Sequence, residues 1–254
     1  MRWPHSYLVD VSPVALAADL FTATPFIAEL SPLRLSAINV TATLCHFRAE
    51  AFSPTLFAHY GVTAPDALVR AAAPRQAQFL AGRCAARLAL AAIAADHRSP
   101  PRGAGGQACW PAGVFGAISH SDSQALCAVG RTSPLGLDIE SPLAADAAEE
   151  LAPLIGGDEE WALLAALPRG VAVALLFSAK ESLYKALYPR LQRYIDFAEV
   201  RLQAADVGGC CLFLRPRSAL AVALPAGQRF AVHWQSCGEQ LLTYTRYSDG
   251  PLPA

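Results

Sequence analysis

The stretch from Phe177 to Leu187, FSAKESLYKAL, constrains the fold of this chain more than any other. It contains neither Gly nor Pro and predicts a helix, on which Glu181 and Lys185 share a face because they lie four residues apart. An ordinary surface ion pair has the same spacing. However, Lys180 and Lys185 are the only lysines of the chain, and every other strong base is an arginine. We therefore favour a function that needs a compact charge able to approach phosphate or to exchange a proton.

The composition is that of a globular protein with one large domain or two of ordinary size. Of the 254 residues, 54% are hydrophobic and 16% are charged, which is enough to bury a substantial core. The net charge of −1 predicts no overall attraction to nucleic acid or to anionic lipid. The seven cysteines show no CxxC spacing, which favours reduced, mostly buried thiols in a cytoplasmic protein. We expect no signal peptide, because the first residues lack a continuous apolar segment and a small-residue cleavage site. We expect no transmembrane segment, because the apolar run at 161–177 is interrupted by Pro and Gly.

Residues 66–98 predict a helix that is rich in arginine. From 68 to 102 the chain has six arginines and a single acid, Asp96. Arg83 and Arg87 lie four residues apart, so they bring like charges to one face. An anionic partner accounts for this pattern better than a solvated face does. The glycines at 103–106 lack the spacing of a nucleotide-binding loop.

Two apolar runs around a polar turn predict a hairpin that carries Ser119 and His120. Neighbouring residues of a strand point to opposite faces, and no GxSxG elbow is present, so a catalytic triad is not expected. The following run, LGLDIE, predicts a strand with Asp138 and Glu140 on one face. These two carboxylates repel each other unless a cation joins them, and their oxygens suit Mg²⁺. Most acids after residue 145 are expected on solvated helix surface.

Helices are expected over 151–190 with breaks at 153–157 and 168–170, and strands in the rest of the chain. The strand-like runs are 37–44 near the N-terminus and 197–202, 210–214, 220–224, 230–234 and 241–247 after the helices. A short match between Phe79–Arg87 and Phe177–Lys185 suggests equivalent helices in two related halves. Ser182 and Lys185 fit the S-x-x-K motif of acylating serines, but the partner motifs of that class are missing.

In this order and spacing, WPxGxxGxISHS, GLDIE and FSAKESLYKALYP resemble the 4′-phosphopantetheinyl transferases. The similarity is closest to the branch that includes the enterobactin synthase component D and broad-specificity enzymes of pseudomonads. The upstream helix, RQAQFLAGRCAARLAL, is similar to that branch as well. The resemblance runs from about residue 70 to residue 202.

The resemblance implies an α/β (α+β) fold of two similar, pseudo-symmetric halves, each a small sheet packed with helices, with the active site between them. Residues 1–132 would hold the coenzyme A-binding helix and the SHS hairpin, and residues 133–254 the magnesium-binding strand and the KES helix. A monomer would transfer 4′-phosphopantetheine from coenzyme A to a serine of acyl or peptidyl carrier proteins. The other product would be adenosine 3′,5′-bisphosphate.

The resemblance also implies roles for the acids and lysines. Asp138, Glu140 and Glu181 would bind Mg²⁺, and Glu181 would in addition be the general base for the carrier serine. Lys180 and Lys185 would contact the phosphates of coenzyme A, with Lys185 stabilising or protonating the leaving group. Such a reaction needs charge neutralisation and a positioned base more than a covalent intermediate.

The remaining implied contacts concern the nucleotide part of coenzyme A. Ser119 and His120 would hold its phosphates, and Arg70, Arg75 and Arg83 would supply cations for the 3′-phosphate.

This chain departs from the family pattern at two positions. Relatives often place a base shortly before the Trp-Pro pair, where this chain has Gln107, so Arg102 is a candidate replacement. The usual small polar residue before ISH is Ala117. Two alternatives stay open: a metal-dependent phosphohydrolase of coenzyme A-like nucleotide pyrophosphates, and a silent carrier- or coenzyme-binding protein.

Overall fold

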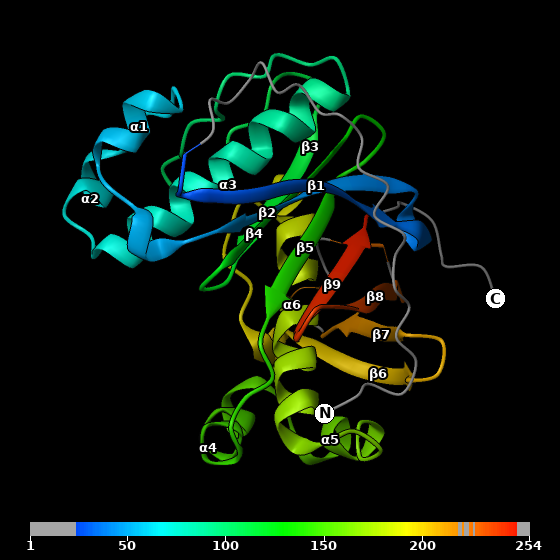
Figure 1. The fold of residues 1–254 in the computed structure, drawn as a ribbon. Coiled ribbons are helices and arrows are strands. Elements are labelled where there is room, and N and C mark those ends of the chain that lie inside the picture. The colour runs from blue at the N-terminus through cyan, green and yellow to red at the C-terminus, as the bar shows by residue number, and fades with distance from the viewer. Residues whose placement is uncertain (1–23, 218–219, 221–223, 226, 248–254) are drawn as a thin grey trace. The chain divides into compact units, whose positions relative to one another are not determined.

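The structure, a computed structural model, describes residues 24–217, 220, 224–225 and 227–247. These residues form two compact units, which divide between Thr132 and Ser133 (Figure 1). The expected mixed α/β class is confirmed, because each unit contains one antiparallel sheet packed with helices.

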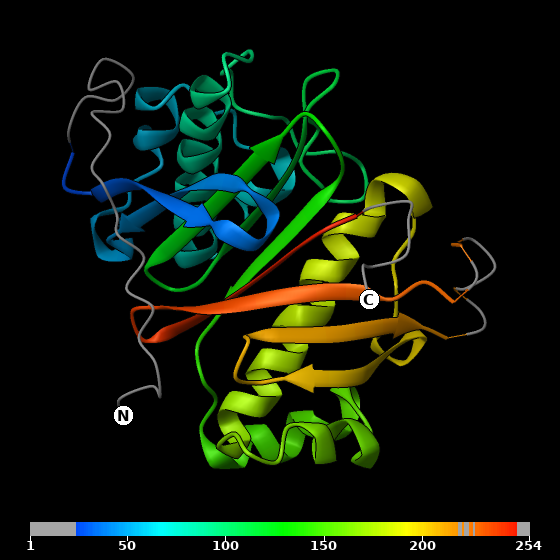
Figure 2. The same cartoon turned by 90° about the vertical axis from the view of Figure 1, so that its right-hand side faces the viewer.

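The N-terminal unit has a four-stranded sheet in the order β1-β2-β4-β3. The strands are β1 (Ile27–Leu35), β2 (Val40–Phe47), β3 (Phe115–His120) and β4 (Gln124–Gly130). Two short helices, α1 (Thr55–His59) and α2 (Asp66–Val69), precede α3 (Ala73–Ala92), which packs on the sheet (Figure 2). The buried face of α3 is rich in alanine, so its backbone can approach β2 and β4 closely.

The predicted hairpin is confirmed as β3 and β4, with Ile118 opposite Cys127. The strand expected at 37–44 begins later, at Val40, because the preceding residues form the 3₁₀-helix η1 (Ser36–Ile38). Asn39 then adopts a left-handed conformation, with φ of 53°, and turns the chain into β2. A second 3₁₀-helix, η2 (Ala49–Ala51), follows β2.

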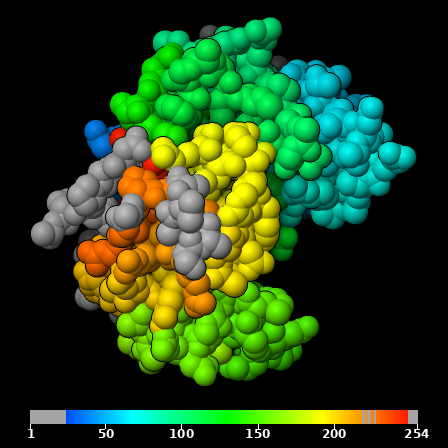
Figure 3. Space-filling view, turned by 180° about the vertical axis from the view of Figure 1, so that it is seen from behind, coloured from blue at the N-terminus to red at the C-terminus, as the bar shows by residue number. Residues whose placement is uncertain are grey.

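The C-terminal unit has a five-stranded sheet in the order β5-β9-β8-β7-β6. Its strands are β5 (Leu135–Glu140), β6 (Val200–Asp206), β7 (Cys211–Pro216), β8 (Phe230–Cys237) and β9 (Gln240–Arg246). The long helix α6 (Arg169–Leu191) lies across one face of this sheet, with most of its contacts to β5 and β9 (Figure 2). The helices α4 (Ala145–Ile155) and α5 (Asp158–Leu163) lie at the surface of this unit (yellow-green in Figure 3).

Two further boundaries differ from the prediction. Pro153 does not break α4, although it supplies no N–H to the helix, and the helix ends two residues later at Ile155, directly before two glycines. The strand expected from 197 begins at Val200, because η3 (Phe197–Glu199) precedes it and is capped by the Asp196 side chain. The strand expected at 220–224 lies largely outside the described residues.

All seven cysteines are free, and five of them are buried, as their spacing predicted. Within the described residues, no helix combines the length and the apolar character that a membrane crossing requires.

Candidate functional site

The strand β5 and the helix α6 approach each other at Gly136. A Cβ atom added to Gly136 would overlap the carbonyl oxygen of Ser182 and would lie 2.8 Å from the backbone nitrogen of Ala186. A glycine inside a strand marks such a close approach. Because strand residues alternate between faces, Asp138 and Glu140 point to the same side as Gly136, toward α6.

Asp138 and Lys185 form an ion pair on the facing sides of β5 and α6. The Nζ atom of Lys185 lies 2.7 Å from Oδ1 of Asp138 and also donates a hydrogen bond of 3.0 Å to the carbonyl of Leu137. Asp138 is only 4% exposed, so its charge needs a partner. The ammonium group therefore balances a buried carboxylate.

Glu181 is half-buried beside this pair. Burial raises the pKa of Glu181, the charge of Lys185 lowers it, and the charge of Asp138 raises it further. Glu181 thus lies within electrostatic reach of both residues. Glu140, the last residue of β5, is half-buried as well.

The magnesium site stays a prediction. Among the residues that the structure describes, no three His, Cys, Asp or Glu side chains are grouped so that they could hold a metal ion. The donor set nevertheless has the right chemistry, because Asp138, Glu140 and Glu181 offer only carboxylate oxygens, which suit Mg²⁺.

Lys180 lies apart from this group. Its Nζ atom is 3.0 Å from Oε1 of Glu160, and the two side chains are 2% and 4% exposed. Consecutive helix residues are rotated by about 100°, so Lys180 and Glu181 point to different sides of α6. The Lys180 ammonium is therefore engaged within the protein, and its expected contact with a phosphate of coenzyme A stays a prediction.

A buried network of hydroxyl groups holds α6 against β9. The Oγ1 atom of Thr243 lies 2.8 Å from Oγ of Ser178 and 2.7 Å from Oγ of Ser182. Ser182 also donates to the carbonyl of Thr243 at 3.0 Å. Ser182 is thus a structural group, which agrees with the rejection of an acylating serine.

The N-terminal unit contains a separate cationic group around Arg83. Arg83 is 5% exposed and lies 4.5 Å from the centre of the Phe79 ring. Burial, together with the smaller effects of the charges of Arg102 and Arg75, lowers the pKa of Arg83 to about 10. Within the described residues, its Nε atom has no hydrogen-bond partner. A buried guanidinium with donor capacity to spare suits a phosphate.

Arg75 joins the group through His120. Arg75 donates a hydrogen bond to Nε2 of His120, at the end of β3, so the neutral ring carries its proton on Nδ1. Burial lowers the pKa of Arg75, and Arg102 lowers it further. Ser119 is buried next to His120 on the same strand.

The three other arginines considered between residues 70 and 102 differ in their surroundings. Arg70 is exposed at the end of α2, outside the group around Arg83. Arg87 donates hydrogen bonds to the backbone carbonyls of Tyr60 and His97, which gives it a structural task. Arg102 pairs its backbone with Ala108 in the loop before β3, and it acts electrostatically on both Arg75 and Arg83.

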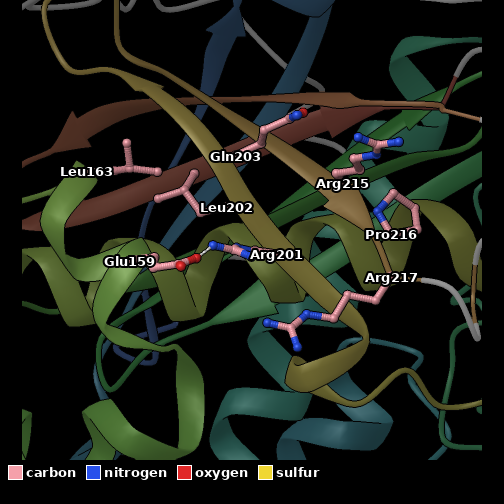
Figure 4. A pocket seen from close by; sticks show the side chains of 8 residues that line it. All are labelled: Glu159, Leu163, Arg201, Leu202, Gln203, Arg215, Pro216 and Arg217. Atoms are coloured by element: carbon pink, nitrogen blue, oxygen red, sulfur yellow. Dashed lines mark ion pairs between the residues drawn. The ribbon is translucent and has the colours of Figure 1, made fainter.

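A hollow of about 430 Å³ lies elsewhere, at the edge of the C-terminal sheet formed by β6 and β7 (Figure 4). Its lining residues are Glu159, Leu163, Arg201, Leu202, Gln203, Arg215, Pro216 and Arg217. None of them is a predicted site residue, and β6 is the edge strand opposite β5. We do not assign the reaction to this hollow.

Sequence reasoning missed two residues that organise the C-terminal unit. Gly136 could have been found as a glycine inside a strand pattern. Most acids after residue 145 were expected on solvated helix surface, and Glu160 was not singled out from them, but it is buried. The spacing of Gly157 and Glu160, three residues apart at a helix start, is the available signal, since Gly157 donates its N–H to Glu160.

Comparisons with known proteins give a consistent result. The chain matches the family model of the 4′-phosphopantetheinyl transferase N-terminal domain over residues 64–130. It matches the model of the 4′-phosphopantetheinyl transferase superfamily over residues 134–244. Together these ranges contain every predicted site residue.

Three curated proteins illustrate the similarity. Enterobactin synthase component D of Salmonella typhi is 37% identical over 180 residues, which cover 70% of this chain and 74% of that protein. The protein of the same name from Escherichia coli (strain K12) is 34% identical over 172 residues, 66% of this chain and 75% of that protein. The 4′-phosphopantetheinyl transferase Npt of Nocardia iowensis is 30% identical over 132 residues, 50% and 59% of the two chains.

Proposed function

Because the chain belongs to the 4′-phosphopantetheinyl transferase superfamily, we propose that it transfers 4′-phosphopantetheine from coenzyme A to a serine of acyl or peptidyl carrier proteins. The other product is adenosine 3′,5′-bisphosphate. The observation that carries this proposal is the group on the facing sides of β5 and α6, in which Lys185 pairs with Asp138 beside Glu181. The family gives no support to a phosphohydrolase.

Glu181 is the candidate general base. Its burial raises its pKa, so the carboxylate is more basic than an exposed one and accepts a proton more readily. It takes the proton of the carrier serine while the serine oxygen attacks the β-phosphorus of coenzyme A. The bond from that phosphorus to the bridging oxygen breaks, and this oxygen leaves with the bisphosphate.

Lys185 is the candidate for stabilising the leaving group. Its ammonium already lies among the acids, at 2.7 Å from Asp138, and it can neutralise the charge that develops on the bridging oxygen or protonate it. The chemistry requires no covalent enzyme intermediate. This agrees with Ser182, which is bound within the hydroxyl network of Thr243.

Asp138, Glu140 and Glu181 are the residues that would hold Mg²⁺. Their oxygens fit a hard cation, and the buried charges on two facing elements need a counter-charge. When bound, the ion neutralises the pyrophosphate of coenzyme A.

The phosphates of coenzyme A would be bound by Arg83, Arg75, His120 and Ser119. Arg102 would supply the positive charge that relatives often place near the position of Gln107. The support is the buried, under-occupied guanidinium of Arg83 and its coupling to Arg75 and Arg102. Arg70 is the weakest candidate, because it is exposed and lies outside this group.

The partner class follows from the relatives. Two of them are named as a component of enterobactin synthase, so a peptidyl carrier of such a synthase is the first acceptor to test. We place the reaction in the cytoplasm, because seven free thiols suit a reducing compartment.

Intact-mass measurement of an apo-carrier tests the proposal. The carrier is incubated with coenzyme A, Mg²⁺ and the protein, and it should gain the mass of one phosphopantetheine. The gain should be absent with Glu181→Gln and with Asp138→Ala. Hydrolysis of coenzyme A at full rate without a carrier would contradict the proposal.

A further inference from the structure

The ion pair between Lys180 and Glu160 is the most completely buried pair of charges among the described residues. Lys180 directs its ammonium at three acceptors. Besides Glu160, it donates to the carbonyls of Ile155 at 2.7 Å and Phe197 at 3.2 Å. The side chain thus ties α6 to the end of α4, to the start of η3 and to α5.

Glu160 uses both of its oxygens. Oε1 accepts from Lys180 and from the backbone N–H of Leu202 at 2.8 Å, and Oε2 accepts from the N–H of Gly157 at 3.1 Å. The contact with Leu202 satisfies a backbone donor on the edge strand β6, and the contact with Gly157 caps the start of α5. One carboxylate therefore joins α5, α6 and β6.

Such a pair does more for position than for stability. Removing two charges from water costs much of what their attraction returns, so an apolar pair of similar size would stabilise the fold as well. An apolar pair would not, however, fix the orientation of α6 relative to its neighbours, because it makes no directional hydrogen bonds. The five polar contacts of Lys180 and Glu160 do fix this orientation.

The position that they fix is that of the neighbouring Glu181. Lys180 holds one side of α6 through Glu160, and Ser178 and Ser182 hold another side through Thr243. With these sides anchored, the rotation of α6 about its axis is set, and Glu181 and Lys185 are directed at β5. We propose that Glu160 is a positioning residue for phosphopantetheine transfer, and that it acts through Lys180 to hold Glu181 in place.

The chain offers a matched control in Glu159. This neighbouring acid has a side chain that is 76% exposed, and it pairs with Arg201 at the hollow of Figure 4. Replacing either acid by Gln removes one charge from the same helix. Only the replacement at 160 disturbs the contacts to Lys180.

The first measurement is steady-state transfer by Glu160→Gln and Glu159→Gln. Glu160→Gln should lower kcat about tenfold, as expected for a displaced catalytic group, while KM for coenzyme A changes by less than about twofold. Glu159→Gln should keep both parameters at the wild-type values. A loss of kcat accompanied by a comparable rise in KM for coenzyme A would indicate a general structural role and overturn the proposal.

A second variant separates the loss of kcat from the loss of folding stability. Glu160→Gln leaves the Lys180 ammonium buried without its counter-charge, which destabilises the fold by itself. Glu160→Gln/Lys180→Met removes both charges at nearly constant volume. Its urea midpoint should return toward the wild-type value, but its kcat should stay about tenfold low. Wild-type kcat in this folded double variant would overturn the proposal.

The inference rests on the proposed function, and the two can fail separately. If the wild-type protein adds nothing to an apo-carrier, the proposed function fails. If the wild type is active and both variants match its kcat, only the positioning role of Glu160 fails.

Discussion

Gly136 and Ser182 set the distance between β5 and α6, because any side chain on Gly136 would meet the backbone of Ser182. The obstructing atoms are backbone atoms and cannot rotate away. We expect Gly136→Ala to destabilise the protein by about 1–3 kcal/mol or more, as overpacking of a core does. It should also lower kcat by about a hundredfold, because a shift of about 1 Å separates Asp138 from α6. Urea unfolding and the carrier mass assay measure the two effects.

Gly208→Ala is the control for this substitution. Gly208 lies in the turn before β7, and an added Cβ would meet only the Asp206 side chain, at 3.8 Å. Its unfolding and its activity should stay close to those of the wild type. An active, stable Gly136→Ala protein would show that the close approach is not required.

The elements around the site could be predicted because their signals are local. The hairpin of Ser119 and His120 and the strand of Asp138 both follow from short apolar periods and turn residues. The helix of Lys185 follows from a long stretch without Gly or Pro. Boundaries were less predictable, since Asn39 and the cap at Asp196 shift strand starts by local hydrogen bonding.

Arg83 should contribute to the affinity for coenzyme A through one phosphate. We expect Arg83→Gln to raise KM for coenzyme A by about tenfold to a hundredfold, the effect of losing one charge-assisted hydrogen-bonded contact. The wild type should discriminate against dephospho-coenzyme A, which lacks the 3′-phosphate. The variant should discriminate much less. Steady-state kinetics with both substrates measure this loss, and unchanged discrimination would exclude a contact between Arg83 and the 3′-phosphate.

Arg87→Gln provides the contrast on the same helix. Arg87 binds the carbonyls of Tyr60 and His97, so its loss should lower the thermal midpoint while KM for coenzyme A stays at the wild-type value. If Arg87→Gln raised KM as much as Arg83→Gln does, the assignment of separate tasks would be wrong.

The partner of Lys180 could not be predicted from sequence. Its acceptors, on Ile155, Glu160 and Phe197, are brought together only by tertiary packing. Buried residues occur on nearly every side of α6, so the helical period does not show which side meets a ligand. Glu160 stands among other acids and has no compositional mark, although its spacing from Gly157 is that of a helix cap.

Thr243 should link the stability of α6 to activity. Thr243→Val keeps the shape but removes the hydroxyl that bridges Ser178 and Ser182. We expect a loss of about 1–2 kcal/mol in the free energy of unfolding, because buried hydroxyls are left without a partner. The variant should also have a lower kcat, since α6 loses an anchor beside Glu181. Urea unfolding and kinetics measure both, and a variant as stable as the wild type would contradict the network.

Glu181 should make the metal-free protein less stable as the pH rises. Burial raises the pKa of Glu181 in the folded state, so between the unfolded pKa and the folded pKa the native protein binds more protons than the unfolded one. Stability therefore falls as the pH rises through this window. In EDTA, Glu181→Gln should have a higher thermal midpoint than the wild type at pH 7, and the difference should shrink as the pH falls toward the ordinary carboxyl range. Mg²⁺ should raise the midpoint of the wild type but not that of the variant, and equal midpoints in EDTA at every pH would contradict the charge assigned to this carboxylate.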